Sequence, residues 1–176
     1  MKKRAIVFYD GNNWYHNLRH TIKPSKIDLQ KLAKFICDHF NLELIEIVYY
    51  NSIPDIKNNE KVYYKHQEFL SELRKQKIIV KTRKLKEISK KNIQVEKGID
   101  VMIASDMIYK SLIEKSCDCC ILISGDADFI PAMQIIKDAK REVITSSVIK
   151  GYSRELMQGK FRFLIIKQEY LNKCLK

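Results

Sequence analysis

Short runs of β-branched and aromatic residues alternate with longer stretches of helical period along most of this chain. Such alternation is typical of β-α-β units, in which helices join parallel strands, and it predicts an α/β fold with a parallel sheet. The Ile121 to Ile123 run is apolar on both faces, as a central parallel strand covered by helices must be. The runs that fit strands are Ala5 to Tyr9, Leu44 to Tyr50, Ile78 to Thr82, Cys120 to Ser124, Val143 to Val148 and Phe163 to Ile166.

Helices are expected in the intervening stretches. Asp28 is a candidate N-cap for a helix whose apolar residues have the i, i+3, i+4, i+7 spacing. Further helices are expected from about Asn58 to Lys75, with Val62, Phe69, Leu70 and Leu73 facing inward, after Gly98, and after Asp128, where Pro131 falls in the first turn. The one stretch without clear period, Lys84 to Gln94, is expected to be a mobile basic loop.

The size and composition suit one unit with a core of its own. The chain has 176 residues, and 45% of them are apolar, so it can bury a core without disulfide bonds. We expect residues 1–176 to form a single domain. No apolar run approaches the roughly 20 residues that span a bilayer, and the apolar stretch after the basic start ends at Asp10. These features predict a cytoplasmic protein.

The chain is strongly basic. Its 33 Lys and Arg residues exceed its 21 Asp and Glu residues by 12, and a single domain with such a charge attracts polyanions, above all nucleic acid. Ten of the basic residues lie between Arg74 and Lys97, against two acidic ones. A solvated, lysine-rich surface has the same composition, so this segment by itself does not identify a binding site.

The five cysteines are odd in number and do not form the paired CxxC spacing of a zinc site. Cys119 and Cys120 should point to opposite faces of a strand, because side chains alternate along it. Buried, reduced thiols are favoured over a metal or redox role.

Aspartates stand at the carboxyl ends of two expected strands, which is where open parallel sheets bind their ligands. The first strand ends in Phe8-Tyr9-Asp10-Gly11-Asn12-Asn13, and the fourth ends in Ser124-Gly125-Asp126-Ala127-Asp128-Phe129. If the backbone stays extended, Ser124, Asp126 and Asp128 project on the same side. Gly11 and Gly125 would allow sharp turns and the close approach of a ligand.

A further acid, Asp100, is expected in the first turn of the helix after Gly98, near the core. Taken one at a time, these aspartates could be helix caps, a partner of the helix dipole or an Asx-turn residue. Four carboxylates that converge without paired basic residues would repel one another, so a cation is expected among them. Carboxylate oxygens suit Mg²⁺ or Mn²⁺, and such an ion beside a basic surface points to phosphodiester hydrolysis.

Other standard sites compete poorly. The chain has no GxxxxGK[ST], GxGxxG or GxSxG motif. His16 and His20 have a helical spacing but lack the third ligand and the glutamate of an HExxH zinc site. Trp14 and Tyr15 are candidates for stacking a base, although a role in the core or at its rim is favoured.

Three motifs resemble, in this order, those of the NYN domain family, the LabA-like branch of the PIN-like nuclease superfamily. They are Phe8-Tyr9-Asp10-Gly11-Asn12-Asn13, Lys97-Gly98-Ile99-Asp100-Val101 and Leu122-Ile123-Ser124-Gly125-Asp126-Ala127-Asp128-Phe129. The resemblance extends from about Arg4 to Ile166. It implies a Rossmann-like, three-layer α/β/α fold with a central, mainly parallel sheet, and a metal-dependent ribonuclease.

The resemblance also implies roles for individual residues. Asp10, Asp100, Asp126 and Asp128 would be the catalytic and metal-binding acids. Asn13 and Ser124 would orient ligands or water, and Asp106 is an outlying candidate. The chain departs from the family in a late motif, where Gly159-Lys160 stands in place of an Ala-Asp pair, so the acid of that motif is absent.

The sequence thus predicts a ribonuclease that uses Mg²⁺ or Mn²⁺. Asp10 and Asp126 would bind the principal ion, and Asp100 and Asp128 would complete its shell or hold a second ion. RNA, single-stranded or structured, is the expected partner, and the residues expected to bind it are Lys81, Arg83, Lys84, Lys86, Lys90, Lys91 and Lys97. A non-catalytic RNA-binding or regulatory module of the same fold is the alternative, and a magnesium-dependent phosphatase or phosphoacceptor domain is a third. A homodimer is left open.

Overall fold

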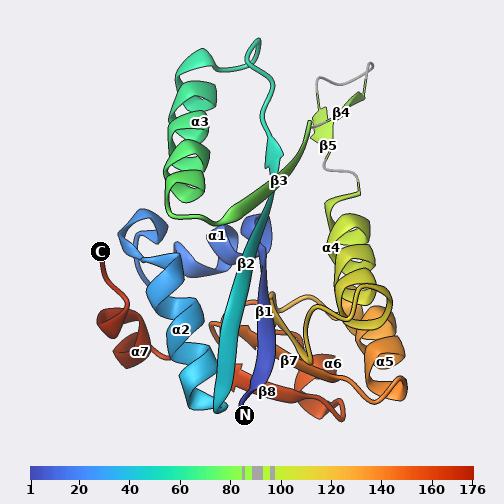
Figure 1. Ribbon diagram of the computed structural model, residues 1–176. Helices are drawn as coiled ribbons and strands as arrows, with labels where there is room; N and C mark the ends of the chain where they lie inside the picture. The colour runs from blue at the N-terminus through green and yellow to red at the C-terminus, as the bar shows by residue number, and fades with distance from the viewer. Residues whose placement is uncertain (85, 89–92, 96–97) are drawn as a thin grey trace.

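A six-stranded, all-parallel sheet forms the middle layer of the protein, and helices cover both of its faces (Figure 1). The computed structural model describes residues 1–84, 86–88, 93–95 and 98–176. The strands of the sheet are β1 (Lys3–Asp10), β2 (Leu42–Ile53), β3 (Ile79–Lys84), β6 (Cys119–Ile123), β7 (Glu142–Ser147) and β8 (Arg162–Ile165). This is the three-layer α/β/α fold that the sequence predicts, and each expected strand is present.

The helices divide into two layers according to the core that they build. α1, α2, α3 and α7 pack on one face of the sheet, and α4, α5 and α6 pack on the other (Figure 1). Their bounds are α1 (Gly11–Leu18), α2 (Leu29–His39), α3 (Glu60–Lys75), α4 (Ile99–Ile108), α5 (Ile130–Asp138), α6 (Arg154–Gln158) and α7 (Gln168–Lys173). None of these helices, within the part of the chain that the structure describes, has the length and apolar character that a membrane span needs.

The helix ends follow from local chemistry. Asp28 accepts hydrogen bonds from the backbone N–H groups of Gln30 and Lys31, at 2.9 and 3.0 Å, and so caps α2 as expected. No bounds for α1, α6 and α7 follow from the sequence, because segments of 8, 5 and 6 residues are too short for their period to be counted.

The central strands are buried on both faces, as their composition indicates. Ala5, Val7 and Tyr9 of β1 belong to one core cluster, whereas Ile6 and Phe8 belong to the other. The cysteines behave in the same way: Cys119 and Cys120 enter opposite clusters, and all five cysteines are buried and free. The expectation of buried, reduced thiols is confirmed.

Two expectations about the segment from α3 onward are wrong. Val62 is 49% exposed, because the amino-terminal part of α3 extends beyond the sheet, and only Leu70 and Leu73 of this helix are buried (Figure 1). The expected loop from Lys84 to Gln94 contains β4 (Lys86–Ile88), which pairs antiparallel with β5 (Ile93–Val95). Strands of three residues are too short to show a period in the sequence. Residues 85 and 89–92 of that loop lie outside the described residues.

The order of the strands decides where a ligand can bind. Across the sheet the order is β3-β2-β1-β6-β7-β8, so the chain builds outward in one direction from β1 and in the other direction from β6. Parallel sheets of this kind bind ligands outside the carboxyl ends of the two strands at which the order reverses. Tyr9 of β1 pairs with Ile123 of β6, which places Asp10 and Ser124 together at this position.

Gly11 and Gly125 let the backbone pack closely at this edge. A Cβ atom at Gly125 would lie 2.3 Å from the carbonyl oxygen of Gly151, and one at Gly11 would lie 2.4 Å from the carbonyl oxygen of Tyr50. Atoms cannot approach so closely, so a larger residue would displace the neighbouring backbone. These glycines were expected to admit a ligand. In the structure it is the protein's own backbone that occupies the space.

We therefore expect Gly125→Ala to lower the free energy of unfolding by about 1–3 kcal/mol, the usual cost of overpacking a well-packed region. Urea denaturation followed by circular dichroism would measure the change. Gly159→Ala is the matched control, because its Cβ would meet no atom closer than 3.1 Å, and that atom belongs to the side chain of Phe161. Equal losses in the two variants would contradict the close-packing role of Gly125.

Candidate functional site

Asp10 and Ser124 meet where the strand order reverses. Asp10 is the last residue of β1 and is only 3% exposed, and Ser124, directly after β6, is fully buried. The Ser124 hydroxyl donates a hydrogen bond of 2.9 Å to Oδ2 of Asp10. Oδ1 of Asp10 accepts a hydrogen bond of 3.2 Å from the backbone N–H of Asn13, so Asp10 also caps α1. The carboxylate is therefore fixed by two elements and lies at the positive end of a helix dipole.

The segment after β6 is tied to the same group. The Ser124 hydroxyl accepts a hydrogen bond of 3.2 Å from the backbone N–H of Asp126. Oδ1 of Asn13 accepts one of 3.1 Å from the backbone N–H of Gly125. Asp10, Asn13, Ser124, Gly125 and Asp126 thus form one hydrogen-bonded unit, which we call the switch-point group. Of the site residues named from the sequence, Asp10, Asn13 and Ser124 enter this unit through their side chains, and Asp126 enters it through its backbone N–H.

Asp126 and Asp128 do not project side by side as expected. The backbone leaves the extended conformation at a 3₁₀ turn over Ala127–Phe129, and Asp128 is exposed. Oδ1 of Asp126 accepts a hydrogen bond of 3.0 Å from the backbone N–H of Asp128, which is an Asx-turn contact. Asp126 therefore starts the turn that directs Asp128 toward solvent.

Asp100 also lies elsewhere than expected. It stands in the first turn of α4, as the sequence predicts, but its side chain is exposed rather than near the core. The apolar residues on either side explain this, because Ile99 and Ile103 take the buried positions of the helix and Asp100 falls on the other side. α4 packs against the 3₁₀ turn that carries Asp128, so both acids belong to elements next to the switch-point group.

The expected convergence of four carboxylates is not found. Among the residues that the structure describes, no three His, Cys, Asp or Glu side chains are arranged so that they could hold one metal ion. The turn at Asp128 and the exposed position of Asp100 account for this difference. Asp10 and Asp126 are the two acids of the switch-point group, and Mg²⁺ is usually bound through one or two carboxylates and keeps several waters.

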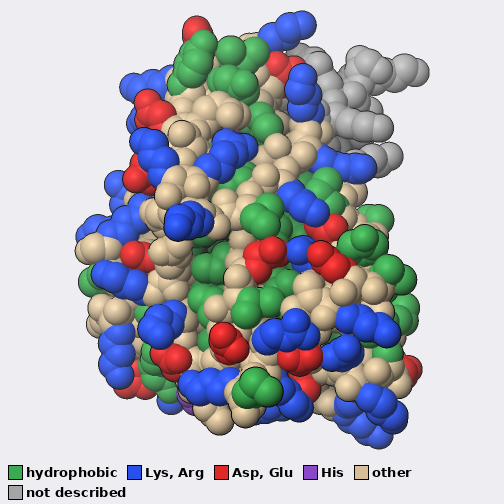
Figure 2. Space-filling view, in the orientation of Figure 1, with side chains coloured by type: hydrophobic (Ala, Val, Ile, Leu, Met, Phe, Trp, Pro, Cys, Tyr) green, Lys and Arg blue, Asp and Glu red, His purple; other side chains and the backbone are tan. Residues whose placement is uncertain are grey.

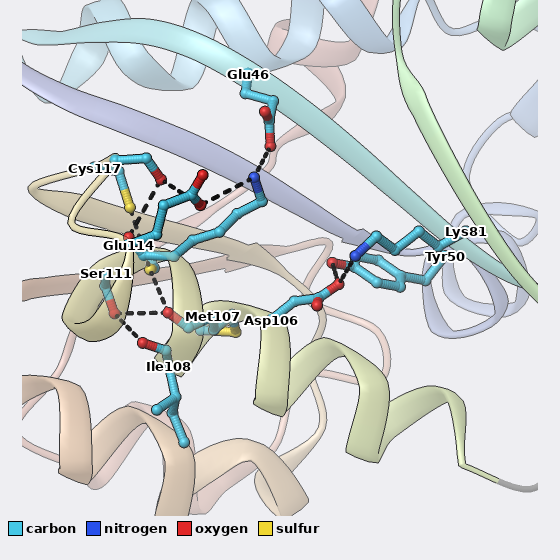
Figure 3. A network of polar contacts seen from close by, with 12 residues as sticks. Glu46, Tyr50, Lys81, Asp106, Met107, Ile108, Ser111, Glu114 and Cys117 are labelled. Atoms are coloured by element: carbon cyan, nitrogen blue, oxygen red, sulfur yellow. Dashed lines mark hydrogen bonds and ion pairs between the residues drawn. The ribbon is translucent and has the colours of Figure 1, made fainter.

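Asp106, the outlying candidate, has partners of its own. Its Oδ2 atom lies 2.6 Å from Nζ of Lys81 and accepts a hydrogen bond of 2.6 Å from the hydroxyl of Tyr50 (Figure 3). Burial, together with this hydrogen bond to a carboxylate, raises the pKa of Tyr50 well above its ordinary value. The contact joins β2, β3 and α4, and it gives Asp106 a structural role.

The residues expected to bind RNA are only partly described. Lys81 is ion-paired with Asp106, and this carboxylate offsets the charge that Lys81 would present to a phosphate. Arg83 is exposed, and its guanidinium lies where a side chain at Gly98 would be; Lys84 is exposed at the end of β3. Lys86 lies in β4. Lys90, Lys91 and Lys97 lie outside the described residues.

One member of the site was missed by the sequence analysis. Nδ2 of Asn17 donates a hydrogen bond of 2.9 Å to Oδ1 of Asn13, one turn earlier in α1. The same oxygen binds the N–H of Gly125, so Asn17 helps to hold Asn13 in place. The signal was present in the i, i+4 spacing of the two asparagines, but it is visible only once α1 is recognised as a helix.

The family model of the NYN domain matches residues 4–167. The chain belongs to the NYN domain family. This family lies in the PIN-like superfamily and consists in general of nucleases that typically depend on a divalent metal. A search among curated proteins gave no match.

Membership of the NYN family agrees with the position of the switch-point group. The match covers β1, α4 and the turn after β6, where the aspartates of the three motifs stand. The protein therefore has a nuclease-like domain of the PIN fold, with Asp10 at the end of one central strand, β1, and Asp126 in the loop after the other, β6.

We expect Ser124→Ala to lower the free energy of unfolding by about 1.5–3 kcal/mol, because a hydrogen bond to a charged group is lost and Asp10 stays buried. Ser147→Ala is the matched control. Ser147 is equally buried, and its hydroxyl has no hydrogen-bond partner among the described residues, so its removal should cost less than about 0.5 kcal/mol. Urea titrations of both variants would measure the difference, and a larger loss in Ser147→Ala would be the contrary result.

Proposed function

We propose that this protein is a metal-dependent ribonuclease that hydrolyses phosphodiester bonds of RNA. The observation that supports this most is the joining of Asp10 and Asp126 through the Ser124 hydroxyl, at the carboxyl ends of β1 and β6. This is where a parallel sheet with such a strand order binds its ligand. The family supplies the class of chemistry, since NYN domains are in general nucleases.

The chain's own residues would position the reacting groups. Ser124 and the backbone N–H of Asn13 fix both oxygens of the Asp10 carboxylate, so this group needs no reorganisation when substrate binds. The Asx turn at Asp126 fixes one of its oxygens, Oδ1. Asp100 and Asp128, both exposed on adjoining elements, would accept hydrogen bonds from water bound at the site, from the solvent side.

A divalent cation, Mg²⁺ or Mn²⁺, would be held by Asp10 and Asp126. When bound, such an ion activates water and stabilises the negative charge that builds up on a phosphate during hydrolysis. The two carboxylates suit an ion that keeps most of its waters, and this is the coordination that Mg²⁺ prefers in phosphoryl-transfer sites.

RNA is the polyanion that the charge of the chain would attract. The formal net charge is +12, and Lys and Arg side chains are spread over the face seen in Figure 2, with fewer Asp and Glu side chains between them. The basic segment from Arg74 to Lys97 leads into α4 and hence toward Asp100 of the second motif. We propose that this segment follows the phosphate backbone.

A non-catalytic RNA-binding module is the rival function. One observation favours it: the described residues hold no group of three metal-binding side chains. The two functions differ in a single readout, because a binding module retains RNA without releasing products in the presence of Mg²⁺ or Mn²⁺.

We expect the purified protein to cleave single-stranded RNA with Mg²⁺ or Mn²⁺ and to stop when EDTA is added. Asp126→Asn should reduce cleavage more than about a hundredfold, because the loss of even an outer-shell partner of a metal ion costs 10–100-fold. The amide oxygen of the new Asn can still accept the N–H of Asp128, so the turn and the fold should persist. Gel electrophoresis of end-labelled RNA would measure the rate.

The matched control is Asp38→Asn, which removes an exposed carboxylate of α2 that pairs with Lys34. It should cleave RNA as the unmodified protein does. Cleavage by Asp126→Asn at the rate of Asp38→Asn would reject the assigned site. RNA binding without cleavage in any divalent metal would favour the rival function.

The proposed role of the basic segment in RNA binding can be tested by removing its positive charges. We expect the combined replacement of Lys84, Lys86, Lys90 and Lys91 by Ala to weaken RNA binding and to flatten its dependence on salt. If all four residues contact phosphates, the slope of log K against log salt should fall by about 2–3, near 0.7 for each contact. Fluorescence anisotropy at several salt concentrations would measure it.

The control for this variant removes the same charge elsewhere. Lys2, Lys34, Lys173 and Lys176 are all exposed, and the first two border a cavity at the amino ends of the strands. Their replacement by Ala should leave the slope nearly unchanged. Equal slopes in the two fourfold variants would show that RNA follows a different surface.

A further inference from the structure

A cavity of about 640 Å³ opens between α1, the end of β2 and α3. Its volume falls within the range of about 300–1,000 Å³ that small-molecule sites occupy. Asn12 and Ser52 belong to its wall, and Nδ2 of Asn12 donates a hydrogen bond of 3.2 Å to the Ser52 hydroxyl. Asn12 is two residues from Asp10, so the cavity adjoins the proposed catalytic acid along the chain.

The wall of the cavity combines aromatic surface with polar groups. Trp14, Tyr49 and Phe69 line it from the core, and their rings are held by edge contacts with neighbouring aromatic rings, such as that of Tyr49 with Phe69 at 5.7 Å. Tyr15 also lines the cavity, yet 52% of it is exposed. An exposed aromatic ring at the mouth of a cavity offers a face on which a flat ring can stack.

His66 supplies an unusual polar atom on the α3 side. It lines the cavity, and its Nδ1 atom is buried with no hydrogen-bond partner among the described residues. Burial lowers the pKa of His66 below its ordinary value, so its imidazole is neutral at physiological pH and offers one donor and one acceptor. A ligand in the cavity would meet the imidazole through its other nitrogen, Nε2, because Nδ1 has almost no solvent-accessible surface.

Two lysines complete the cavity. Lys23 lies before α2, Lys65 lies within α3, and both side chains line the cavity. A ligand that suits the whole wall has a flat aromatic ring, hydrogen-bonding groups on the edge of that ring and an anionic group attached to it. A nucleotide has all three features. An aliphatic ligand would leave His66 unsatisfied, and a bare phosphate would leave the aromatic surface uncovered.

We propose that this cavity is a nucleobase subsite, which receives one base of the RNA next to the phosphodiester bond at Asp10 and Asp126. Tyr15 would stack on the base, His66 and Asn12 would meet its edge, and Lys23 and Lys65 would hold the adjoining phosphates. This inference rests on the proposed function, which identifies RNA as the substrate. It adds a site at which the enzyme binds one base of that RNA.

The cavity can be tested without any cleavage. Trp14 is the only tryptophan of the chain and lines the cavity, so intrinsic fluorescence reports directly on binding there. We expect adenosine and uridine 5′-monophosphates to quench it in a saturable way, and ribose 5-phosphate, which lacks a base, to have no such effect. Calorimetric titration of the same compounds would check the affinities independently.

Variants assign the site to particular side chains. Tyr15→Ala should weaken nucleotide binding at least about fivefold, since stacking of a base on an aromatic side chain contributes about 1–3 kcal/mol. Tyr64→Ala is the matched control: Tyr64 is also 52% exposed, lies on α3 and does not line the cavity. The affinity of the Tyr64→Ala protein for nucleotides should be unchanged. His66→Phe, which keeps a ring of similar size without the nitrogens, should also weaken binding.

A second experiment relates the cavity to RNA. The binding of single-stranded RNA oligonucleotides to the Asp126→Asn protein would be measured. Each oligonucleotide of the series has one abasic nucleotide, at a different position. We expect one position at which loss of the base weakens binding, and we expect this loss to disappear when Tyr15→Ala is added.

The outcomes separate this inference from the proposed function. Normal RNA cleavage with no quenching by nucleotides, and with no effect of Tyr15→Ala, overturns the subsite and leaves the ribonuclease intact. Quenching that depends on Tyr15 without RNA cleavage in any divalent metal supports the subsite and rejects the ribonuclease. Equal quenching by ribose 5-phosphate also overturns the subsite, because the base would then contribute nothing.

Discussion

The hydrogen bond from the Ser124 hydroxyl to the Asp10 carboxylate is the interaction on which the candidate site depends. It joins the ends of two strands that are 114 residues apart in the chain. The same hydroxyl accepts the backbone N–H of Asp126, so one small side chain sets the positions of two acids. Because Ser124 is fully buried, water cannot compete for these bonds, and the geometry is fixed before any substrate arrives.

This bond exists because of the order of the strands. β1 and β6 are neighbours in the sheet, and both are covered on each face by apolar side chains that belong to the two cores. The absence of a side chain at Gly125 lets the Gly151 backbone pack directly against the loop after β6. Asn13 then closes the arrangement from α1, with its side chain held by Asn17. Core packing and site geometry are therefore parts of one structure.

Much of this could be predicted from the sequence. The strands and the longer helices are visible as periods, and the motifs place Asp10, Ser124 and Asp126 at strand ends that are close in any parallel sheet of this order. The positions of Asp128 and Asp100 could not be predicted as well. A single 3₁₀ turn ends the extended backbone before Asp128 and leaves that residue exposed, and one step around a helix separates the buried Ile99 from the exposed Asp100. The pairing of Lys81 with Asp106 likewise requires knowledge of which strand lies beside α4.

The sequence by itself determined the fold class, the basic charge and the residue types at the ends of β1 and β6, because hydrophobic period and local motifs are properties of neighbouring residues. Only the tertiary structure decided which aspartates come together, which are held by lysine or turned to solvent, and that aromatic side chains from α1, β2 and α3 enclose a cavity. The reason is that a carboxylate's surroundings come from segments far away in the chain. A shift of one residue in a turn, or of one position on a helix, is too small to alter the hydrophobic pattern of the sequence. Such a shift nevertheless moves the side chain of an aspartate from the core to the surface.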